Sequence, residues 1–135
     1  MSIIGQQPVD PNVISHRLNS WTLETRIANK VDAASVVSAA SDYLTLMNGL
    51  HPDHGLLWVL DASDASDFEF EALPSIQENV KILKPVGLDR LAFILTGKAV
   101  PFAGFIESSF QGTGVSVFFF GSRQEVLAWI KRRCR

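Results

Sequence analysis

The spacing of hydrophobic and polar positions changes several times along the chain, and each change predicts a different element. Residues 13–18 and 21–27 alternate between the two kinds of side chain, with Asn19-Ser20 between them. This pattern is typical of an antiparallel hairpin with one buried face. The side chains expected on that face are Ile14, His16, Leu18, Trp21, Leu23, Thr25 and Ile27. We expect the hairpin at or near an edge of a sheet.

Uninterrupted apolar runs at 56–60 and 91–95, and the largely apolar run at 115–120, predict buried strands of the kind that is covered on both faces. Apolar side chains at helical spacing predict helices between and after these strands. Asp32 is expected to cap the first helix, and Ser122-Arg-Gln-Glu125 matches a capping box that opens the last one. The inward-facing helical residues are Val36, Val37, Ala40, Tyr43, Leu44, Met47, Leu73, Ile76, Val80, Leu83, Phe102, Phe105, Ile106, Phe110, Val126, Leu127 and Ile130.

The resulting order is β-β-α-β-α-β-α-β-α. Repeated alternation of strand and helix implies right-handed crossovers and a mainly parallel sheet. We therefore predict a single α/β domain over residues 13–135, with an antiparallel hairpin at the sheet edge, helices packed on the sheet, and a polar lead over residues 1–12.

Composition narrows the class of protein. The chain has 135 residues, 47% of them hydrophobic and 19% charged, with a formal net charge of -2, which describes one compact domain. The basic residues gather only at the C-terminus, which is typical of a solvated helix end and argues against nucleic-acid binding. We expect no membrane span and no export signal, and the single Cys134 excludes an internal disulfide, so the predicted location is cytoplasmic.

Small polar side chains follow the first buried strand. Asp61, Ser63 and Ser66 lie in an acidic turn after it, and Thr96-Gly97-Lys98 follow the next buried strand. Ligands and partners of open α/β sheets bind at such carboxyl ends, so these residues form the predicted partner or ligand surface. The alternatives are ordinary turns, in which Asp and Ser side chains bond their own backbone, and a tight strand-to-helix turn with a solvated lysine.

The last third of the chain is rich in phenylalanine. Helical spacing places most of these rings in the core, but Phe102, Phe105 and Ile106 are also candidates for an apolar pocket or its lip. His51 and His54 have the spacing of a metal pair, although two imidazoles do not suffice for zinc. We assign them to a polar loop and expect neither a metal nor a cofactor.

Two segments carry a family resemblance. Leu57-Trp-Val-Leu-Asp61 and Val117-Phe-Phe-Phe-Gly-Ser-Arg-Gln-Glu-Val-Leu-Ala-Trp-Ile130, in this order of elements, resemble the STAS/SpoIIAA-like superfamily and its small bacterial STAS/Sec14-like proteins. The resemblance implies a SpoIIAA-like fold. In the anti-sigma factor antagonists of that superfamily a serine at a helix start is phosphorylated. The corresponding start here reads Phe68-Glu-Phe-Glu-Ala72, so the switch does not carry over to this chain. Whether Ser63 or Ser66 is ever phosphorylated stays open.

The function expected from the sequence is a non-catalytic regulatory or protein-interaction module, because no acid-base or nucleophile constellation is present. The alternative is a small carrier of an apolar or acidic, lipid-like ligand held between the 101–110 helix and the sheet. The expected partner is accordingly an unidentified protein or a small apolar ligand. Self-association as a homodimer is a further alternative.

Overall fold

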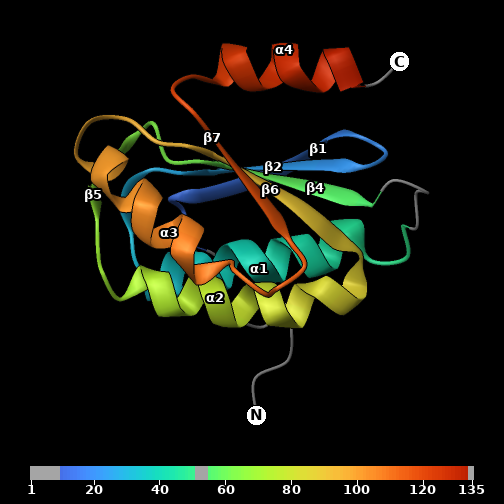
Figure 1. Cartoon of the computed structure of the whole chain (residues 1–135), viewed down its shortest axis with the longest axis horizontal. Coiled ribbons are helices and arrows are strands. Elements are labelled where there is room, and N and C mark those ends of the chain that lie inside the picture. Colours follow the sequence, from blue (N-terminus) through green and yellow to red (C-terminus); the bar gives the residue numbers. More distant parts are fainter. Residues whose placement is uncertain (1–9, 51–54, 134–135) are drawn as a thin grey trace.

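A computed structural model describes residues 10–50 and 55–133 (Figure 1). Its main sheet has five strands in the order β1-β2-β4-β6-β7. The strands are β1 (Val13–Asn19), β2 (Thr22–Ile27), β4 (Leu56–Asp61), β6 (Leu88–Ile94) and β7 (Ser116–Phe120). β1 pairs antiparallel with β2, and the other neighbours are parallel. The α/β fold class and the hairpin at the sheet edge are therefore confirmed. His51, His54 and Cys134 lie outside the described residues.

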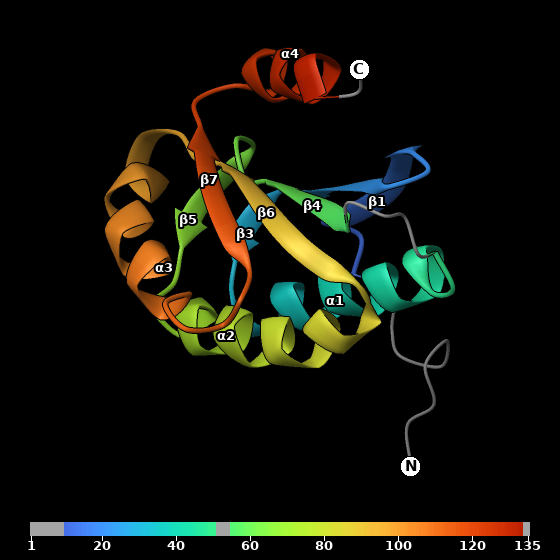
Figure 2. The same cartoon turned by 45° about the vertical axis from the view of Figure 1, so that its right-hand side comes forward.

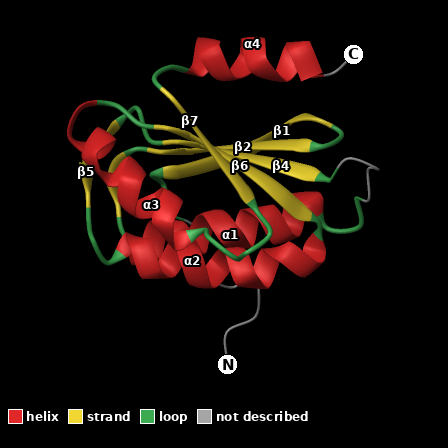
Figure 3. Ribbon diagram, viewed as in Figure 1, coloured by secondary structure: helices red, strands yellow, loops and turns green. Residues whose placement is uncertain are grey.

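The helices divide unequally between the two faces of the sheet (Figure 3). One face is covered by α1 (Ala33–Met47) and α2 (Ala72–Leu83), with α3 (Ala103–Ser109) beside them. On the opposite face the figure shows α4 (Arg123–Arg133) alone. A short 3-10 helix, η1 (Lys84–Val86), follows α2, and another, η2 (Gly97–Phe102), precedes α3. We call the two sides of the sheet the α1/α2 face and the α4 face.

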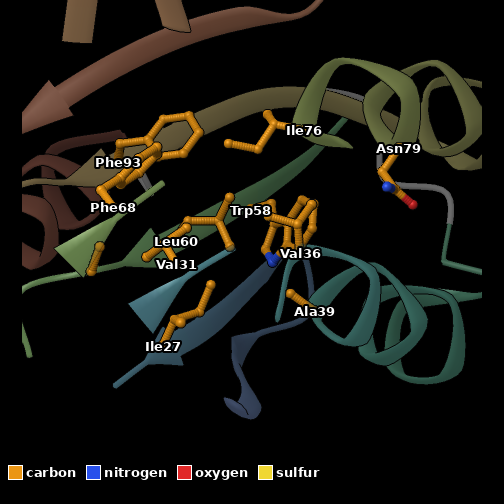
Figure 4. A pocket seen from close by; sticks show the side chains of 11 residues that line it. Ile27, Val31, Val36, Ala39, Trp58, Leu60, Phe68, Ile76, Asn79 and Phe93 are labelled. Carbon is orange, nitrogen blue, oxygen red and sulfur yellow. The ribbon is translucent and has the colours of Figure 1, made fainter. Parts of the chain in front are cut away.

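The α1/α2 face is packed by large apolar side chains. Trp58 of β4 is 2% exposed, its ring lies 5.4 Å from that of Tyr43 in α1, and its indole N–H donates to Thr25 Oγ1 at 2.9 Å. A cavity of about 20 Å³ remains between α1, α2 and the sheet (Figure 4). It is lined by Ile27, Val31, Val36, Ala39, Trp58, Leu60, Ala62, Phe68, Ile76, Asn79 and Phe93. Such a volume holds about one water-sized molecule and is a packing defect of the core.

The α4 face combines apolar packing with buried charge. Trp129 of α4 lies against two rings of β7, at 4.9 Å from Phe118 and 5.3 Å from Phe120. Beside this contact Glu24 of β2 is only 1% exposed, and Arg123, the first residue of α4, donates to both of its carboxylate oxygens at 2.7 and 3.1 Å. His16 Nε2 lies 3.0 Å from the same carboxylate. An ion pair therefore fixes the start of α4 on the sheet.

Both predicted helix caps are present. The Asp32 carboxylate accepts from the Ser35 N–H at 2.9 Å, and the Ser35 hydroxyl accepts from the Asp32 N–H at 2.9 Å, which completes a capping box. At α4 the Ser122 hydroxyl accepts from the Glu125 N–H at 3.3 Å. The Glu125 carboxylate reaches Gly121 N, one residue further back than the predicted box.

The acidic turn after β4 differs from the prediction. It contains a strand, β5 (Ala65–Phe68), which pairs with β3 (Asn29–Val31) in a separate parallel two-stranded sheet. The next helix begins at Ala72 and not at Phe68. Hydrogen bonds from Asn29 N to Asp64 O and from Glu69 N to Val31 O hold these segments together. The polar sequences of β3 and β5 are typical of turns, and each strand forms only by pairing with the other, more than thirty residues away. The local pattern therefore did not predict them.

Two predicted faces are also wrong. Ile14 and His16 were expected on a buried side, but Ile14 is 63% exposed. Ser15 donates to Asp42 of α1, so its neighbours Ile14 and His16 point to the α4 face, where cover is sparse. Similarly, residues 117–120 are half-buried rather than covered on both faces. β7 is the outermost strand of the main sheet, so it has a neighbouring strand along one edge only, and its side chains stay partly exposed.

Candidate functional site

The parallel strands end at one edge of the sheet, where Asp61, the last residue of β4, is the most enclosed polar group. Its carboxylate is 2% exposed. Oδ1 accepts from the Ser63 N–H at 2.9 Å and from the Ser63 hydroxyl at 2.6 Å, while Oδ2 lies 3.7 Å from Arg26 Nε at the end of β2. The buried Asp61 carboxylate therefore holds the turn in place through its two hydrogen bonds with Ser63, and Ser63 itself is exposed.

The turn after β6 lies beside this loop. Thr96 Oγ1 donates to the Ser63 carbonyl at 3.3 Å, which joins the two predicted strand-end turns. Gly97 and Lys98 follow on the exposed start of η2. Gly97 has φ +54°, a left-handed conformation that suits glycine, and a Cβ there would meet no atom within 4 Å. The structure thus brings Asp61, Ser63 and Thr96 together, with Lys98 next to them in sequence.

Ser66 belongs to a neighbouring part of the same surface. Its hydroxyl donates to the Asn29 carbonyl at 2.9 Å, so it fastens β5 to β3. The residue remains exposed. Ser63 and Ser66 therefore both have intramolecular hydrogen-bond acceptors, as the turn interpretation of the sequence predicts.

An exposed aromatic cluster adjoins these turns, and one member was missed by sequence analysis. Phe70 is 65% exposed and Phe105 is 54% exposed, with their ring centroids 5.7 Å apart. Phe102 lies between Phe70 at 5.0 Å and the buried Phe68 at 4.5 Å. The alternation of Phe68 and Phe70 around Glu69 signals one inward and one outward ring, but it does not show where the outward ring points. We call Phe70, Phe102 and Phe105 the aromatic cluster.

The three side chains predicted for an apolar pocket do not share a cavity. Ile106 is fully buried, while Phe105 lies on the surface against Phe70. A hollow of about 240 Å³ is found nearby, between η2, the start of α3 and the end of β7. Its lining residues are Leu95, Val100, Ala103, Phe119, Phe120 and Gly121. We call it the β7 groove.

Two carboxylates, Glu69 and Glu71, flank Phe70 in the sequence before α2. A hydrogen bond from Glu69 is the main cause that raises the pKa of Glu71 above its ordinary value. The same bond, together with Lys30, lowers the pKa of Glu69. Lys30 Nζ lies 3.3 Å from Glu69 Oε1, and this contact raises the pKa of the lysine. The segment that carries Phe70 is therefore acidic, and one of its carboxylates is paired with a lysine.

Within residues 10–50 and 55–133, no group of three or more His, Cys, Asp or Glu side chains is arranged to hold a metal ion. No helix in the same ranges is long and apolar enough to cross a membrane. These findings concern only the described part of the chain.

Comparison with known proteins identifies the fold. No protein-family model matches this sequence, and no curated protein matches it. A structural match is an uncharacterized protein of the DUF3478 family with a SpoIIAA-like fold from Shewanella loihica PV-4, with TM-score 0.57, 14% identity, and cover of 87% of this chain and 90% of that one. Another is the anti-sigma factor antagonist SpoIIAA in its unphosphorylated form, with TM-score 0.56, 10% identity, and cover of 89% and 97%.

Both matches extend over most of each chain, so this protein has a STAS/SpoIIAA-like fold. The resemblance found in the sequence is confirmed at the level of fold. Proteins with the same fold can have unrelated functions, because function depends on the residues of a particular site. The role of this chain therefore has to be inferred from its own surface residues.

Proposed function

We propose that this protein is a non-catalytic regulatory or protein-interaction module of STAS type. Its partner docks where the sheet ends, on Ser63, Ser66, Thr96, Gly97 and Lys98, with Asp61 supporting the turn from below. The observation that supports this most is the aromatic cluster beside these residues, because two large rings stand more than half exposed. Exposed aromatic groups next to polar ones are typical of the centre and rim of a protein interface.

The polar groups at this edge support a structural role better than catalysis. Asp61 is engaged by Ser63 and lies near Arg26, so its carboxylate has the partners that hold a buried charge in place. Lys98 remains exposed on η2, where it can contact an acidic group of a partner. A partner protein would thus meet a preformed surface with rings at one side and a cation at the other.

The proposed module works without a phosphoserine switch. The residue before α2 is Glu71, and the first three helical residues, Ala72, Leu73 and Pro74, carry no hydroxyl. Ser75, the fourth residue, is part-buried and donates to the Ala33 carbonyl at 3.4 Å. The nearest serines along the chain before α2, Ser63 and Ser66, are held by Asp61 and by the Asn29 carbonyl. Binding itself, rather than covalent modification, would carry the signal. A Ser63→Ala, Ser66→Ala variant loses two contacts of the docking surface, so it should bind more weakly but should still bind.

Affinity purification with three tagged chains tests the docking surface. The chains are the wild type, the Phe70→Ser, Phe105→Ser variant, and the control Ile82→Ser, which removes an equally exposed apolar side chain (53%) from the far end of α2. A partner recovered with the wild type and the control should be lost at least tenfold from the double variant. Lys98→Ala should weaken the same partner by a smaller factor.

Circular dichroism and a melting curve establish that each variant is folded. Recovery of the same proteins in equal amounts by the wild type and by the folded double variant would contradict docking at the aromatic cluster.

The β7 groove favours a second function, that of a carrier for a small apolar ligand. The groove is lined almost entirely by apolar side chains, and Val100 on its rim is 53% exposed. It lies between the η2–α3 segment and the end of the sheet, close to the place where the sequence predicts a ligand pocket. Its lining does not include Phe102, Phe105 or Ile106, the residues predicted for that pocket. A short acyl chain or a single ring is the chemistry that such a hollow accepts.

Native mass spectrometry of freshly purified protein tests the carrier. Added mass that is lost on denaturation, and that is absent from an Ala103→Trp variant with a filled groove, would support it. A ligand-free wild-type spectrum, combined with no displacement of a fluorescent fatty acid, would contradict it.

A further inference from the structure

The outer edge of β7 is an open end of the main sheet. β7 pairs with β6 on one side, and no strand among residues 10–50 and 55–133 lies on its other side (Figure 2). An open edge presents backbone N–H and C=O groups that favour pairing with another strand. This edge therefore has hydrogen-bonding capacity that the described fold does not use.

The pairing of β7 with β6 shows which backbone groups face outward. The Phe120 carbonyl accepts from Leu95 N at 3.1 Å, so the backbone of Phe120 points toward β6. Directions alternate along a strand, so Phe118 and Ser116 also point toward β6. The N–H and C=O groups of Val117 and Phe119 consequently point away from the sheet.

The side chains of β7 do not protect this edge. Its sequence, Ser116-Val-Phe-Phe-Phe120, contains no charge and no proline, and residues 117–120 are half-buried. The opposite edge, β1, carries His16 and the exposed Arg17, and its register shifts between Arg17 and Asn19. Charges and irregularities of this kind block edge-to-edge association, so of the two edges of the main sheet that the described residues form, the β7 edge lacks such protection.

We propose that β7 pairs antiparallel with β7 of a second copy of this chain, and that the two sheets join into one. The pairing places Val117 opposite Phe119 of the partner, and Phe119 opposite Val117 of the partner. These are the hydrogen-bonded pairs, because their backbone groups face outward. The two-fold axis passes midway between the two copies of Phe118, which lie opposite each other as a non-hydrogen-bonded pair.

A second copy fits this edge better than a charged segment of another protein does. When β7 pairs with its own copy, both strands are uncharged, so no like charges face each other across the junction. This pairing also uses both outward-facing residues of each strand and leaves neither set of backbone groups unpaired. The half-buried ring of Phe118 would gain cover from Phe118 of the partner, and that of Phe119 from Val117 of the partner.

Sedimentation velocity over a range of protein concentrations, with three full-length chains, tests the dimer. The wild type should sediment as a dimer. Val117→Pro should be at least tenfold weaker in self-association while staying folded, because its N–H is not used within the sheet. Arg17→Pro is the matched control: its N–H also faces outward, but from the β1 edge, so its dimer should persist.

A cross-link tests the register independently. In a Cys134→Ser background, Phe118→Cys should form an intermolecular disulfide under mild oxidation, because the Cα atoms of a non-hydrogen-bonded pair lie roughly 4.5 Å apart, within the range that a disulfide spans. Ser116→Cys in the same background should not, since each cysteine would lie about 13 Å along the strand from its copy.

Each outcome decides the matter. A monomeric wild type at every concentration overturns the proposal, as does a folded Val117→Pro chain that still dimerises. Efficient cross-linking at residue 116 with none at residue 118 overturns the register and with it the proposed pairing. These results are separate from the partner test above, because that test changes the aromatic cluster and leaves β7 intact.

Discussion

The two faces of the sheet are built in different ways. Against the α1/α2 face, tryptophan, tyrosine and aliphatic side chains pack together, and Trp58 has its indole N–H satisfied by Thr25. Against the α4 face, a tryptophan packs on β7 beside a buried carboxylate that is held by Arg123. Hydrophobic burial holds the first layer, whereas the second layer also depends on an ion pair.

The two kinds of packing should differ in how firmly they hold their helices on the sheet. Apolar packing is non-directional and is not weakened by charge screening, and it spreads over two long helices. A buried carboxylate needs its partner, because removal of the cation leaves an uncompensated charge in the interior. We therefore expect α4 to be the layer that loosens first, and the following predictions test that expectation.

Trp58→Ala should cause the largest loss of stability. It removes a ring that is 2% exposed and leaves a void next to an existing cavity. Truncation of such a side chain costs about 3–5 kcal/mol of unfolding free energy. Urea titration followed by circular dichroism measures this value, and Ile82→Ala on the outer side of α2 is the control. A loss no larger than that of the control would contradict the importance of the α1/α2 face.

Trp129→Ala makes the same chemical change on the other face and should cost less. Among the described residues, no other helix lies on the side of the sheet that carries Trp129, so surrounding atoms relax more easily, and the expected loss is about 2–3 kcal/mol. Hydrogen exchange should show faster exchange in α4 with little change in α1. Equal acceleration in both helices would show that the two layers unfold as one unit.

Arg123→Met should destabilise the protein by about 1–2 kcal/mol, less than for a fully buried pair because Arg123 is 40% exposed. The variant leaves Glu24 with His16 as its remaining partner. Thermal unfolding at low salt measures the effect. Arg132→Met, an exposed change on the same helix, is the control. Identical melting temperatures for the two variants would contradict an anchoring ion pair.

Glu71→Gln should produce the smallest change and should stabilise the protein slightly at neutral pH. The pKa of Glu71 is raised by its bond with Glu69, so the folded state binds a proton more readily than the unfolded chain. The wild type therefore gains stability as the pH falls through this raised pKa, and the advantage of the variant disappears there. Melting temperatures across pH measure this trend, with Glu78→Gln as the control.

The candidate site was predictable only in part. Asp61, Ser63 and Thr96 follow apolar strands in the sequence, and parallel strands bring their carboxyl ends together, so their proximity follows from local pattern. Phe70 did not stand out, because it lies in a segment that reads as a helix start. Its exposure results from β5, a strand that forms only when β3 supplies a pairing edge.

The order of the main strands and helices, the hairpin at the edge and the α/β class could be predicted from the sequence, because these follow from periodicity and from local capping. The β3–β5 pair, the exposure of Ile14 and the contact of Glu24 with Arg123 became visible only in the folded chain. The last two residues are ninety-nine positions apart. Periodicity shows which side chains share a face of an element, whereas the cover on that face depends on segments that are distant in sequence.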